Sequence, residues 1–507
     1  KQVIAKLKTD GLAPTMDTVF NKLNQPISLG YCNMGIVKDV GANVKGIKVG
    51  DRVISNGSHA EYVSIPANLC AKVPDGVKDE HASFAVLSSI SLQGVRLCNP
   101  TIGETISVIG LGIIGLIVTQ ILKANGCEVI AIDYDRKKLS IAEKYGCRIV
   151  DLSKHNLPIK EILNMTNGRG VDASIICAST KSNDPVHLAA STLRKRGRII
   201  LVGVTGLNLK REDFYEKEIT FQVSSSYGPG RYDKNYEDKG IDYPIGFVRW
   251  TEKRNFDAVL EMIRTNKINI EELISHKFKF KSIYKAYELI LTQKDNLGIV
   301  IEYNKKDQKI KNKDRNINNY NFITKQINKS IPTISFIGSG NYTSKILIPE
   351  FKKKNVYLDA IVSENGISSS HNGKKYNFKK ISTDSDGVIQ SKSSNTIVIS
   401  TRHDTHAEYI LKAINHNKNI FVEKPLCLNL KDLNKIKKSY LSKKYQGIMM
   451  IGFNRRFSPL IKKARTLLEA IKTPSSFIYT INAGNIPSDH WTQDPKVGGG
   501  RIIGEVC

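Results

Sequence analysis

The sequence predicts an α/β fold built on two tandem Rossmann domains, each a doubly wound parallel sheet. Two observations predict it: apolar strand runs alternate with helical patterns twice along the chain, and each alternation begins with a glycine-rich turn after its first strand. The length of 507 residues fits about three domains. With 40% apolar and 24% charged residues the chain can bury ordinary cores, which excludes a wholly disordered protein.

The first hundred residues have the pattern of short strands broken by glycine turns. We expect strands at Gly35–Val37 and Glu61–Pro66, with a turn at Val49–Val53. Longer apolar strands then alternate with helices, which is typical of βαβ units. The expected strands are Thr105–Ile109, Glu128–Ile132, Ala173–Cys177 and Arg198–Val202 in the first sheet, and Thr333–Ile337, Leu358–Val362, Thr396–Ser400 and Asn419–Val422 in the second. Between them, Asn304–Ser330 holds seven Lys and seven Asn in 27 residues, which predicts a solvated linker.

The chain is strongly basic, with a formal net charge of +28. Lysines outnumber arginines by 57 to 19, they are spread along the chain, and no run alternates basic with aromatic residues. We therefore expect no nucleic-acid partner, although the positive field suits a sugar phosphate or nucleotide-sugar substrate. Eight cysteines without a C-x-x-C pair exclude a disulfide scaffold and a zinc ribbon.

One run, Thr105–Leu122, has 18 residues without a charge, which is the lower limit for a membrane span. Three glycines interrupt it after a β-branched stretch, so a buried strand, a turn and a buried helix explain it better. The N-terminus has no charged segment followed by an apolar stretch and a cleavage site, so we expect no signal peptide. We expect a cytoplasmic protein without a membrane partner.

The first glycine turn, Gly110–Gly115, follows a strand and opens a helix. In this G-x-G-x-x-G pattern, Gly110 allows the tight turn, Gly112 lets the backbone approach a diphosphate, and Gly115 lets helix and strand pack closely. Asp133 closes the next strand 23 residues after Gly110, where its carboxylate can accept both ribose hydroxyls and repel a 2′-phosphate. The pattern predicts an NAD(H) site. Its expected residues are Gly110, Gly112, Ile113, Ile114, Gly115, Asp133, Val202 and Gly203.

Around this turn, over about residues 15–303, the chain resembles the medium-chain dehydrogenase/reductase superfamily, which includes alcohol dehydrogenases. The resemblance rests on the glycine turn and on the motifs Gly30–Val37, Val40–Gly41, Val49–Val53 and Ala60–Val63. It implies a GroES-like β domain before the Rossmann domain. Zinc-dependent members have Gly-His-Glu where this chain has Tyr31 and Cys32 after Gly30, and a further ligand where it has Ser89. Only Cys32 and His59 are nearby candidate ligands, which is too few for a tetrahedral site, so we expect no zinc.

The loop Ser224–Tyr232 follows a strand in the same module, and we expect it near the nicotinamide end. In this loop Tyr227 could donate a proton and Arg231 could clamp an anion, which makes both candidate substrate contacts. The alternative is a polar loop with a tight Gly-Pro-Gly turn.

The second glycine turn, Gly338–Thr343, reads G-x-G-x-x-T, with a small residue at the third position. The next strand ends at Ser363 instead of an acid, and a hydroxyl repels a 2′-phosphate less than a carboxylate does. The neighbouring Glu364 does not favour a phosphate, so NAD(H) and NADP(H) both remain open here. The expected cofactor-binding residues are Gly338, Gly340, Asn341, Ser363, Thr401, His406 and Glu423.

Three later motifs, Ile399–His406, Asn419–Pro425 and Ile451–Phe457, resemble the glucose–fructose oxidoreductase/inositol dehydrogenase family (Gfo/Idh/MocA), over about residues 332–507. The Glu-Lys-Pro tripeptide at a strand end is that family's most recognisable mark. Proline fixes the turn and leaves Lys424 at the carboxyl edge of the sheet, where its ammonium can polarise a carbinol or carbonyl oxygen and relay a proton. We predict Lys424 as the catalytic residue and Arg455 as a substrate contact.

The same resemblance implies a main acid/base histidine after a glycine-rich stretch. Gly498–Cys507 matches the approach to it, but the chain ends about one residue earlier, and the Asp expected four positions before that histidine falls on Gly504. We therefore expect most of the C-terminal substrate domain, and the extreme N-terminal part of the first module, to be absent. His490 and Trp491 could line a sugar pocket or pack under a loop.

The fusion of the two modules resembles the bacterial bi-domain oxidoreductases of surface-polysaccharide clusters. This resemblance implies a zinc-independent NAD(P)-dependent oxidoreductase acting on CH–OH groups of a sugar or nucleotide-sugar, and a homo-oligomer. The alternative is a nucleotide-binding redox sensor or scaffold with impaired sites. The expected domains are a partial GroES-like β domain at 1–100, a Rossmann domain at 101–240, the end of the first module at 241–303, a basic linker at 304–331, a second Rossmann domain at 332–455 and a truncated α+β domain at 456–507.

Overall fold

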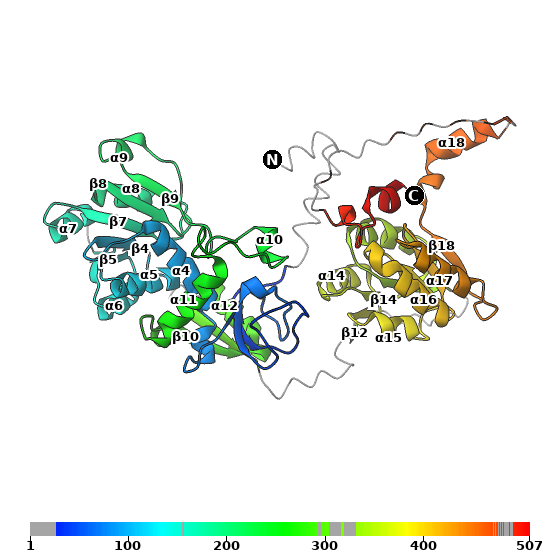
Figure 1. The fold of residues 1–507 in the computed structure, drawn as a ribbon, viewed down its shortest axis with the longest axis horizontal. Coiled ribbons are helices and arrows are strands. Elements are labelled where there is room, and N and C mark those ends of the chain that lie inside the picture. The colour runs from blue at the N-terminus through cyan, green and yellow to red at the C-terminus, as the bar shows by residue number, and fades with distance from the viewer. Residues whose placement is uncertain are drawn as a thin grey trace. The chain divides into compact units, whose positions relative to one another are not determined.

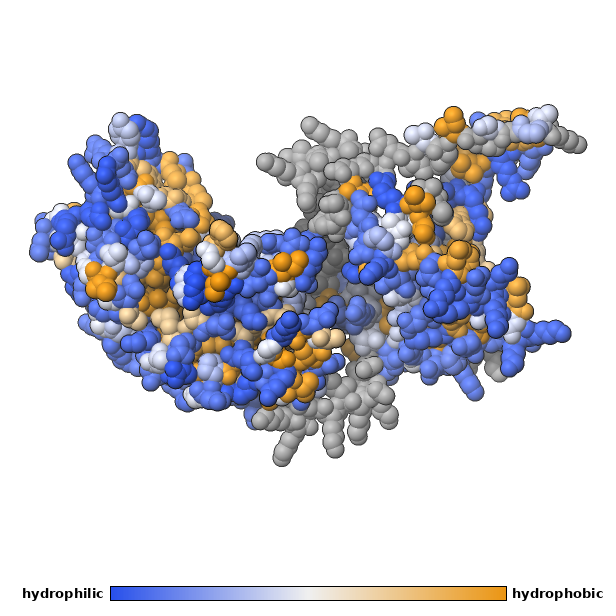
Figure 2. Space-filling view, in the orientation of Figure 1, coloured by the Kyte–Doolittle hydropathy of each residue, from blue (hydrophilic) through white to orange (hydrophobic). Residues whose placement is uncertain are grey.

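The computed structural model describes residues 27–506, except 155–156, 293–295, 304–315, 319–330, 470, 472, 475, 477, 479, 481–485 and 487–489. The described residues form two compact units, one over residues 28–308 and one from residue 309 on (Figure 1). Hydrophilic residues cover most of the visible surface of both units (Figure 2). None of the helices in the described ranges is long and apolar enough to cross a membrane.

The first unit begins with a small antiparallel sheet in the order β1-β2-β3. Its strands are β1 (Asn33–Ile36), β2 (Arg52–Ser55) and β3 (Cys70–Lys72). The predicted turn before β2 is present, and Gly50 has a φ of +90° there. The predicted strand at Glu61–Pro66 is wrong, because these residues lie outside the sheet. Tyr62 and Val63 are both exposed, so their apolar side chains have no core face to pack on.

A six-stranded parallel sheet follows, in the order β6-β5-β4-β7-β8-β9. Its strands are β4 (Thr105–Ile109), β5 (Glu128–Asp133), β6 (Arg148–Asp151), β7 (Val171–Ile176), β8 (Leu193–Leu201) and β9 (Thr220–Val223). The connecting helices are α5 (Ile113–Ala124), α6 (Arg136–Lys144), α7 (Pro158–Met165), α8 (Asp184–Thr192) and α9 (Arg211–Tyr215). The charge-free run at Thr105–Leu122 is therefore the fully buried strand β4, a turn and most of α5.

The rest of the first unit packs around this sheet. Its helices are α3 (Asp79–Ala82), α4 (Ala85–Cys98), α10 (Lys234–Glu237), α11 (Glu252–Arg264) and α12 (Ile283–Thr292), and a small parallel sheet pairs β10 (Ile274–Lys279) with β11 (Gly298–Glu302). Helix α4 contacts both α5 and β2, so it joins the β-rich part to the Rossmann core.

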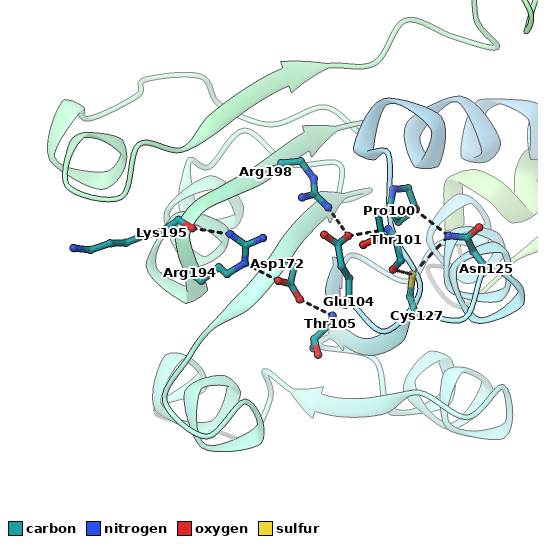
Figure 3. A network of polar contacts seen from close by, with 10 residues as sticks. All are labelled: Pro100, Thr101, Glu104, Thr105, Asn125, Cys127, Asp172, Arg194, Lys195 and Arg198. Atoms are coloured by element: carbon teal, nitrogen blue, oxygen red, sulfur yellow. Dashed lines mark hydrogen bonds and ion pairs between the residues drawn. The ribbon is translucent and has the colours of Figure 1, made fainter.

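Two ion pairs lie at the amino edge of the six-stranded sheet (Figure 3). Arg194 Nε lies 2.6 Å from an Asp172 carboxylate oxygen, and Arg198 Nη2 lies 2.5 Å from Glu104 Oε2. Asp172 also accepts a hydrogen bond from the Thr105 backbone N–H at 2.8 Å. These partly buried carboxylates are thus paired within the fold, and they tie β4, β7 and β8 together.

The second unit holds a seven-stranded sheet in the order β12-β15-β14-β13-β16-β17-β18, parallel except for β12. Its strands are β12 (Asn316–Asn318), β13 (Thr333–Ile337), β14 (Tyr357–Val362), β15 (Lys380–Ser382), β16 (Thr396–Ile399), β17 (Asn419–Val422) and β18 (Met449–Ile451). The helices are α13 (Ile348–Lys352), α14 (Ile367–Tyr376), α15 (Ser385–Gln390), α16 (His406–Asn415), α17 (Leu430–Tyr440) and α18 (Pro459–Leu468).

Strand β12 lies inside the segment predicted to be a solvated linker. It pairs antiparallel with β15, and Ser382 Oγ donates a hydrogen bond to Asn316 Oδ1 at 2.7 Å. Backbone pairing with the sheet edge holds these residues, whose few apolar side chains gave no signal of a strand. The predicted fold class, with an antiparallel GroES-like sheet and two Rossmann sheets, is confirmed.

Candidate functional site

The first glycine turn lies at the point where the strand order of its sheet reverses, between β4 and β7. Ligands of open α/β sheets bind at such a switch point, beyond the carboxyl ends of the strands. Gly110 has a φ of +93°, and a Cβ built on it would lie 2.6 Å from the Ala178 nitrogen, after β7. Both the conformation and the close approach require glycine, as the sequence predicted.

Gly112 and Gly115 serve different purposes in this turn. A Cβ on Gly115 would lie 2.0 Å from the Gly110 carbonyl oxygen, so this glycine allows the helix to pack on the turn. A Cβ on Gly112 would meet nothing within 4 Å, and Gly112 precedes α5 without any side-chain cap. Open space therefore lies over the first N–H groups of α5, with Ile113 and Ile114 half-buried beside it. We call this open space at Gly112 and the start of α5 the cradle of the turn. It suits a diphosphate, because the free N–H groups at a helix start and the helix dipole both stabilise negative charge.

Asp133 is fixed beside the turn by three backbone N–H groups. One carboxylate oxygen accepts from Leu111 at 2.6 Å, and the other accepts from Tyr134 at 2.7 Å and Asp135 at 2.9 Å. A carboxylate offers about four lone pairs, so it keeps capacity for a further donor such as a ribose hydroxyl.

Val202 and Gly203 lie at the neighbouring strand end, as predicted. Their backbone N–H groups both donate to the Ile176 carbonyl oxygen at 2.9 Å. A Cβ on Gly203 would lie 2.1 Å from the Ala178 carbonyl oxygen. Ala178 therefore contacts both Gly110 and Gly203, yet the sequence gave no signal for it because these contacts join three separate strands.

Tyr227 and Arg231 are more enclosed than the sequence suggested. Tyr227 is 3% exposed, its ring packs on Phe256, and its hydroxyl accepts a hydrogen bond from Asn56 at 3.0 Å. Arg231 Nη1 lies 2.6 Å from Glu237 Oε1, so an anion would compete with this carboxylate for the guanidinium. Their substrate roles stay predictions.

Sequence reasoning missed Glu252, at the start of α11. Its side chain is fully buried, both carboxyl oxygens lack a hydrogen-bond donor, and it faces Glu237 and Arg231. Burial, with a smaller contribution from Glu237, raises the pKa of Glu252 to about 8. The protonated form can donate to Glu237, which explains how the buried carboxyl is tolerated. A glutamate in a first helical turn is ordinary in sequence, so no signal could have found it.

The side chains at and near the zinc-ligand positions make contacts within the fold. Ser89 Oγ is buried and donates to the Ala85 carbonyl oxygen at 2.8 Å, and His59 Nδ1 lies 2.6 Å from the Tyr287 hydroxyl. Burial raises the pKa of the Cys32 thiol to about 12. Across the residues that the structure describes, only Glu80, His81 and Glu271 bring three ligand atoms together. Lys78 pairs with Glu271 and Lys277 pairs with Glu80, so both carboxylates of that group already have cationic partners.

The second glycine turn repeats this arrangement between β13 and β16. Gly338 has a φ of +105°, and a Cβ on it would lie 2.6 Å from the Ser400 carbonyl oxygen. A Cβ on Gly340 would meet nothing within 4 Å, and Asn341 beside it is exposed. Buried Thr343 donates from Oγ1 to Ser400 Oγ at 2.8 Å, which explains why threonine fits the third position.

Ser363 and His406 make contacts within the fold. Ser363 Oγ accepts a hydrogen bond from the Ser369 N–H at 3.1 Å and pairs with its hydroxyl at 2.9 Å. His406 is fully buried, with Nδ1 2.7 Å from the Pro425 carbonyl oxygen and Nε2 3.2 Å from that of Thr401. Burial lowers the pKa of His406. The ring therefore holds the turn after Lys424 against the end of β16. Its cofactor contact stays a prediction.

Lys424 follows β17 at the carboxyl edge of the sheet, as predicted. Its Nζ donates to the Gly504 carbonyl oxygen at 2.6 Å. Burial raises the pKa of the preceding Glu423, whose carboxylate lies against Gly452. The segment that Lys424 contacts also carries the glycine-rich stretch, so the structure brings both motifs to one sheet edge.

The two neighbouring residues His490 and Trp491 have different surroundings, because Trp491 packs against His403 whereas His490 is exposed. Trp491 stacks edge-on against His403, with ring centroids 4.8 Å apart, and His403 Nδ1 lies 2.8 Å from the Gly498 carbonyl oxygen. His403 follows β16, so Trp491 lies at the sheet edge that carries Lys424. His490 is exposed and caps the short helix at Trp491–Gln493. Arg455 is exposed too, between β18 and α18.

Three family profiles match the chain. An alcohol dehydrogenase GroES-like domain matches residues 2–75, a zinc-binding dehydrogenase family matches 114–239, and an oxidoreductase family with an NAD-binding Rossmann fold (Gfo/Idh/MocA) matches 333–453. The chain therefore joins an alcohol dehydrogenase-like module to a Gfo/Idh/MocA Rossmann module, as the motifs predicted. NAD(P) is the cofactor class of both Rossmann modules.

Several curated relatives match about half of the chain. An L-idonate 5-dehydrogenase of Vitis vinifera is 24% identical over 306 residues, covering 52% of this chain and 76% of that protein. An alcohol dehydrogenase of Cupriavidus necator is 28% identical over 247 residues, covering 48% and 62%. An (R,R)-butanediol dehydrogenase of Bacillus subtilis is 25% identical over 308 residues, covering 55% and 82%.

Proposed function

We propose that this chain is an NAD(P)-dependent oxidoreductase that moves a hydride to or from a carbinol or carbonyl carbon of a sugar or nucleotide-sugar. The observation that carries the proposal is the position of Lys424, at the carboxyl edge of a sheet whose glycine turn has the open cradle at Gly340. The matched relatives support it, since their names describe dehydrogenases of alcohols and of a sugar acid.

The residues present fit the cofactor. The N-terminus of α5 and Asp133 would hold diphosphate and ribose in the first module, and the turn braced by Thr343 would hold the diphosphate in the second. When bound, NAD(P) supplies the nicotinamide carbon that takes or gives the hydride. Lys424 Nζ, which donates to a carbonyl oxygen in this structure, would donate to the substrate oxygen, polarise it and relay its proton.

Several finer features belong to the proposal. Asp133 favours NAD(H) in the first module, whereas Ser363 leaves NAD(H) or NADP(H) open in the second. The ligand set at Tyr31, Cys32 and Ser89 supports a zinc-independent reaction. A role in surface-polysaccharide synthesis and a homo-oligomeric state stay predictions from the resemblance. The absence of a nucleic-acid partner stays a prediction from the spread of the lysines along the chain.

The test compares hydride transfer by wild type, Lys424→Met and Lys431→Met across a panel of nucleotide-sugars and polyols. Lys431 is a matched control because it is exposed on α17, after the same strand. We expect Lys424→Met to lose on the order of 10²–10⁴-fold in kcat, with NADH and NADPH affinities unchanged. Equal turnover by wild type and Lys424→Met would remove this lysine from the mechanism.

A second candidate is a nucleotide-binding redox sensor or scaffold. The Arg231–Glu237 ion pair and the incomplete ligand set at Cys32 favour it for the first module. Tight NADH binding without turnover on any substrate of the panel would support this function over the enzyme.

A further inference from the structure

A pocket of about 460 Å³ opens in the first unit where several helices end. The last turns of α4 and α5 and the end of α11 surround it, and Trp250 lines it from the loop before α11. Its walls combine aliphatic side chains, such as Val95 and Ile121, with the cations Arg96 and Lys267. This volume lies in the range of small-molecule sites.

The pocket is separate from the nucleotide crevice. Helix α5 begins beside the first glycine turn, and at ~1.5 Å per residue its last turn, which lines the pocket with Ile121 and Ala124, lies about 12–16 Å from its first residue. Pro100 and Asn125, which line the pocket, lie next to the Glu104–Arg198 ion pair at the amino edge of the sheet (Figure 3). A ligand here would not contact the cofactor.

Two guanidinium groups stack on the Trp250 indole, and of the nearby cations Arg96 and Lys267 line the pocket whereas Arg249 does not. The guanidinium carbon of Arg96 lies 3.4 Å from the centre of the Trp250 ring, and that of Arg249 lies 3.8 Å from it. Lys267 lines the same pocket. Over the described parts of the chain, no acidic side chain pairs with any of the three. Burial, with a smaller contribution from the nearby Arg249, lowers the pKa of Arg96.

Arg96 is held in place before any ligand arrives. Its Nε donates to Asn255 Oδ1 at 2.9 Å, and Asn255 is fully buried. Stacking on Trp250 fixes the plane of the guanidinium, and the Nε bond leaves its terminal nitrogens for another acceptor. A fixed guanidinium loses little conformational freedom on binding an oxyanion.

We propose that this pocket binds a phosphate monoester of a small molecule. A phosphate monoester carries about −1.5 to −2 charges at pH 7, so it balances the two cations of the lining, Arg96 and Lys267, better than a carboxylate does. Arginine is well suited to phosphate oxygens, and Lys267 adds a point charge. The aliphatic wall would contact the carbon body of the ester.

The test uses the fluorescence of Trp250 in the full chain. The chain has two tryptophans, so Trp491→Phe leaves Trp250 as the reporter. This protein is titrated with glucose 6-phosphate, inorganic phosphate and acetate at constant ionic strength, with NAD⁺ at saturation to occupy the glycine turns. Lys267→Met removes one cation from the pocket, and Lys160→Met is the control because Lys160 is an exposed lysine on α7.

We expect a saturable fluorescence change with glucose 6-phosphate and none with acetate. Lys267→Met should weaken this binding at least about fivefold, and Lys160→Met should leave it unchanged. Tighter binding of the sugar phosphate than of inorganic phosphate would show that the carbon body contacts the wall, and equal binding would identify free phosphate as the ligand. No saturable change, or equal affinity in Lys267→Met and wild type, would overturn the proposal and leave the cations as caps of the helix ends.

Discussion

The Asp133 carboxylate accepts a hydrogen bond from the Leu111 N–H at 2.6 Å, which fixes the acid at the end of β5 onto the glycine turn after β4. Two motifs that lie apart in the sequence are thereby joined at one sheet edge. The sequence related them through their spacing of 23 residues, which suits one dinucleotide, and the structure shows the bond that joins them.

Asp133→Ser should shift the cofactor preference of the first module. The substitution removes the negative charge that repels a 2′-phosphate and the acceptors for the ribose hydroxyls. We expect NADH to bind about tenfold more weakly and NADPH to bind more tightly than in wild type. Calorimetric titration in a Gly340→Asp background, which blocks the second turn, measures the first module alone. An unchanged ratio of the two affinities would contradict the assignment of Asp133.

Gly112→Ala should weaken NADH binding without lowering Tm, whereas Gly115→Ala should lower Tm. Alanine at Gly112 meets open space, so the protein should fold normally, yet the new methyl group would obstruct a diphosphate. Alanine at Gly115 would clash with the Gly110 carbonyl oxygen at 2.0 Å, so we expect a lower Tm. Thermal unfolding and NADH titration of both variants check this. The same loss of Tm in both, or normal NADH binding by Gly112→Ala, would rule out the cradle.

Much of both nucleotide sites could be predicted because the glycine turns are local patterns, each confined to one strand, one turn and one helix. The contacts that complete the sites are not local. Ala178 meets two glycines from other strands, and Thr343 bonds to Ser400 across 57 residues. The sequence places His406 after a strand end, but only tertiary packing decides that its ring lies between the Pro425 and Thr401 carbonyl oxygens.

Stability of the first unit should fall as pH rises from about 5 to 8. Glu252 has a folded pKa of about 8, well above its ordinary value, so the folded chain binds one more proton than the unfolded chain across this window. One proton corresponds to a slope of ~1.4 kcal/mol per pH unit in the free energy of unfolding. Urea unfolding of wild type and Glu252→Gln at pH 5.5 and 8 measures the difference. Glu261→Gln, an exposed position on the same helix, is the control, and an identical pH dependence in wild type and Glu252→Gln would exclude a protonated Glu252.

Metal removal should leave activity intact. The side chains at the zinc-ligand positions include Ser89, whose hydroxyl donates to its own helix, and Tyr31, which is half exposed. We expect dialysis against 1,10-phenanthroline to leave both hydride transfer and Tm unchanged, because no step needs a Lewis acid. Elemental analysis of the purified chain provides the control. One zinc per chain together with loss of activity on its removal would refute zinc independence.

The most direct test of the account is the number of dinucleotides that one chain binds. Calorimetric titration of the full chain with NADH and NADPH together should reach a stoichiometry of two. It should fall to one in Gly112→Asp and in Gly340→Asp, because each carboxylate would occupy an open cradle and repel the diphosphate there. A wild-type chain that binds neither NADH nor NADPH would contradict the claim that the two glycine turns are dinucleotide sites.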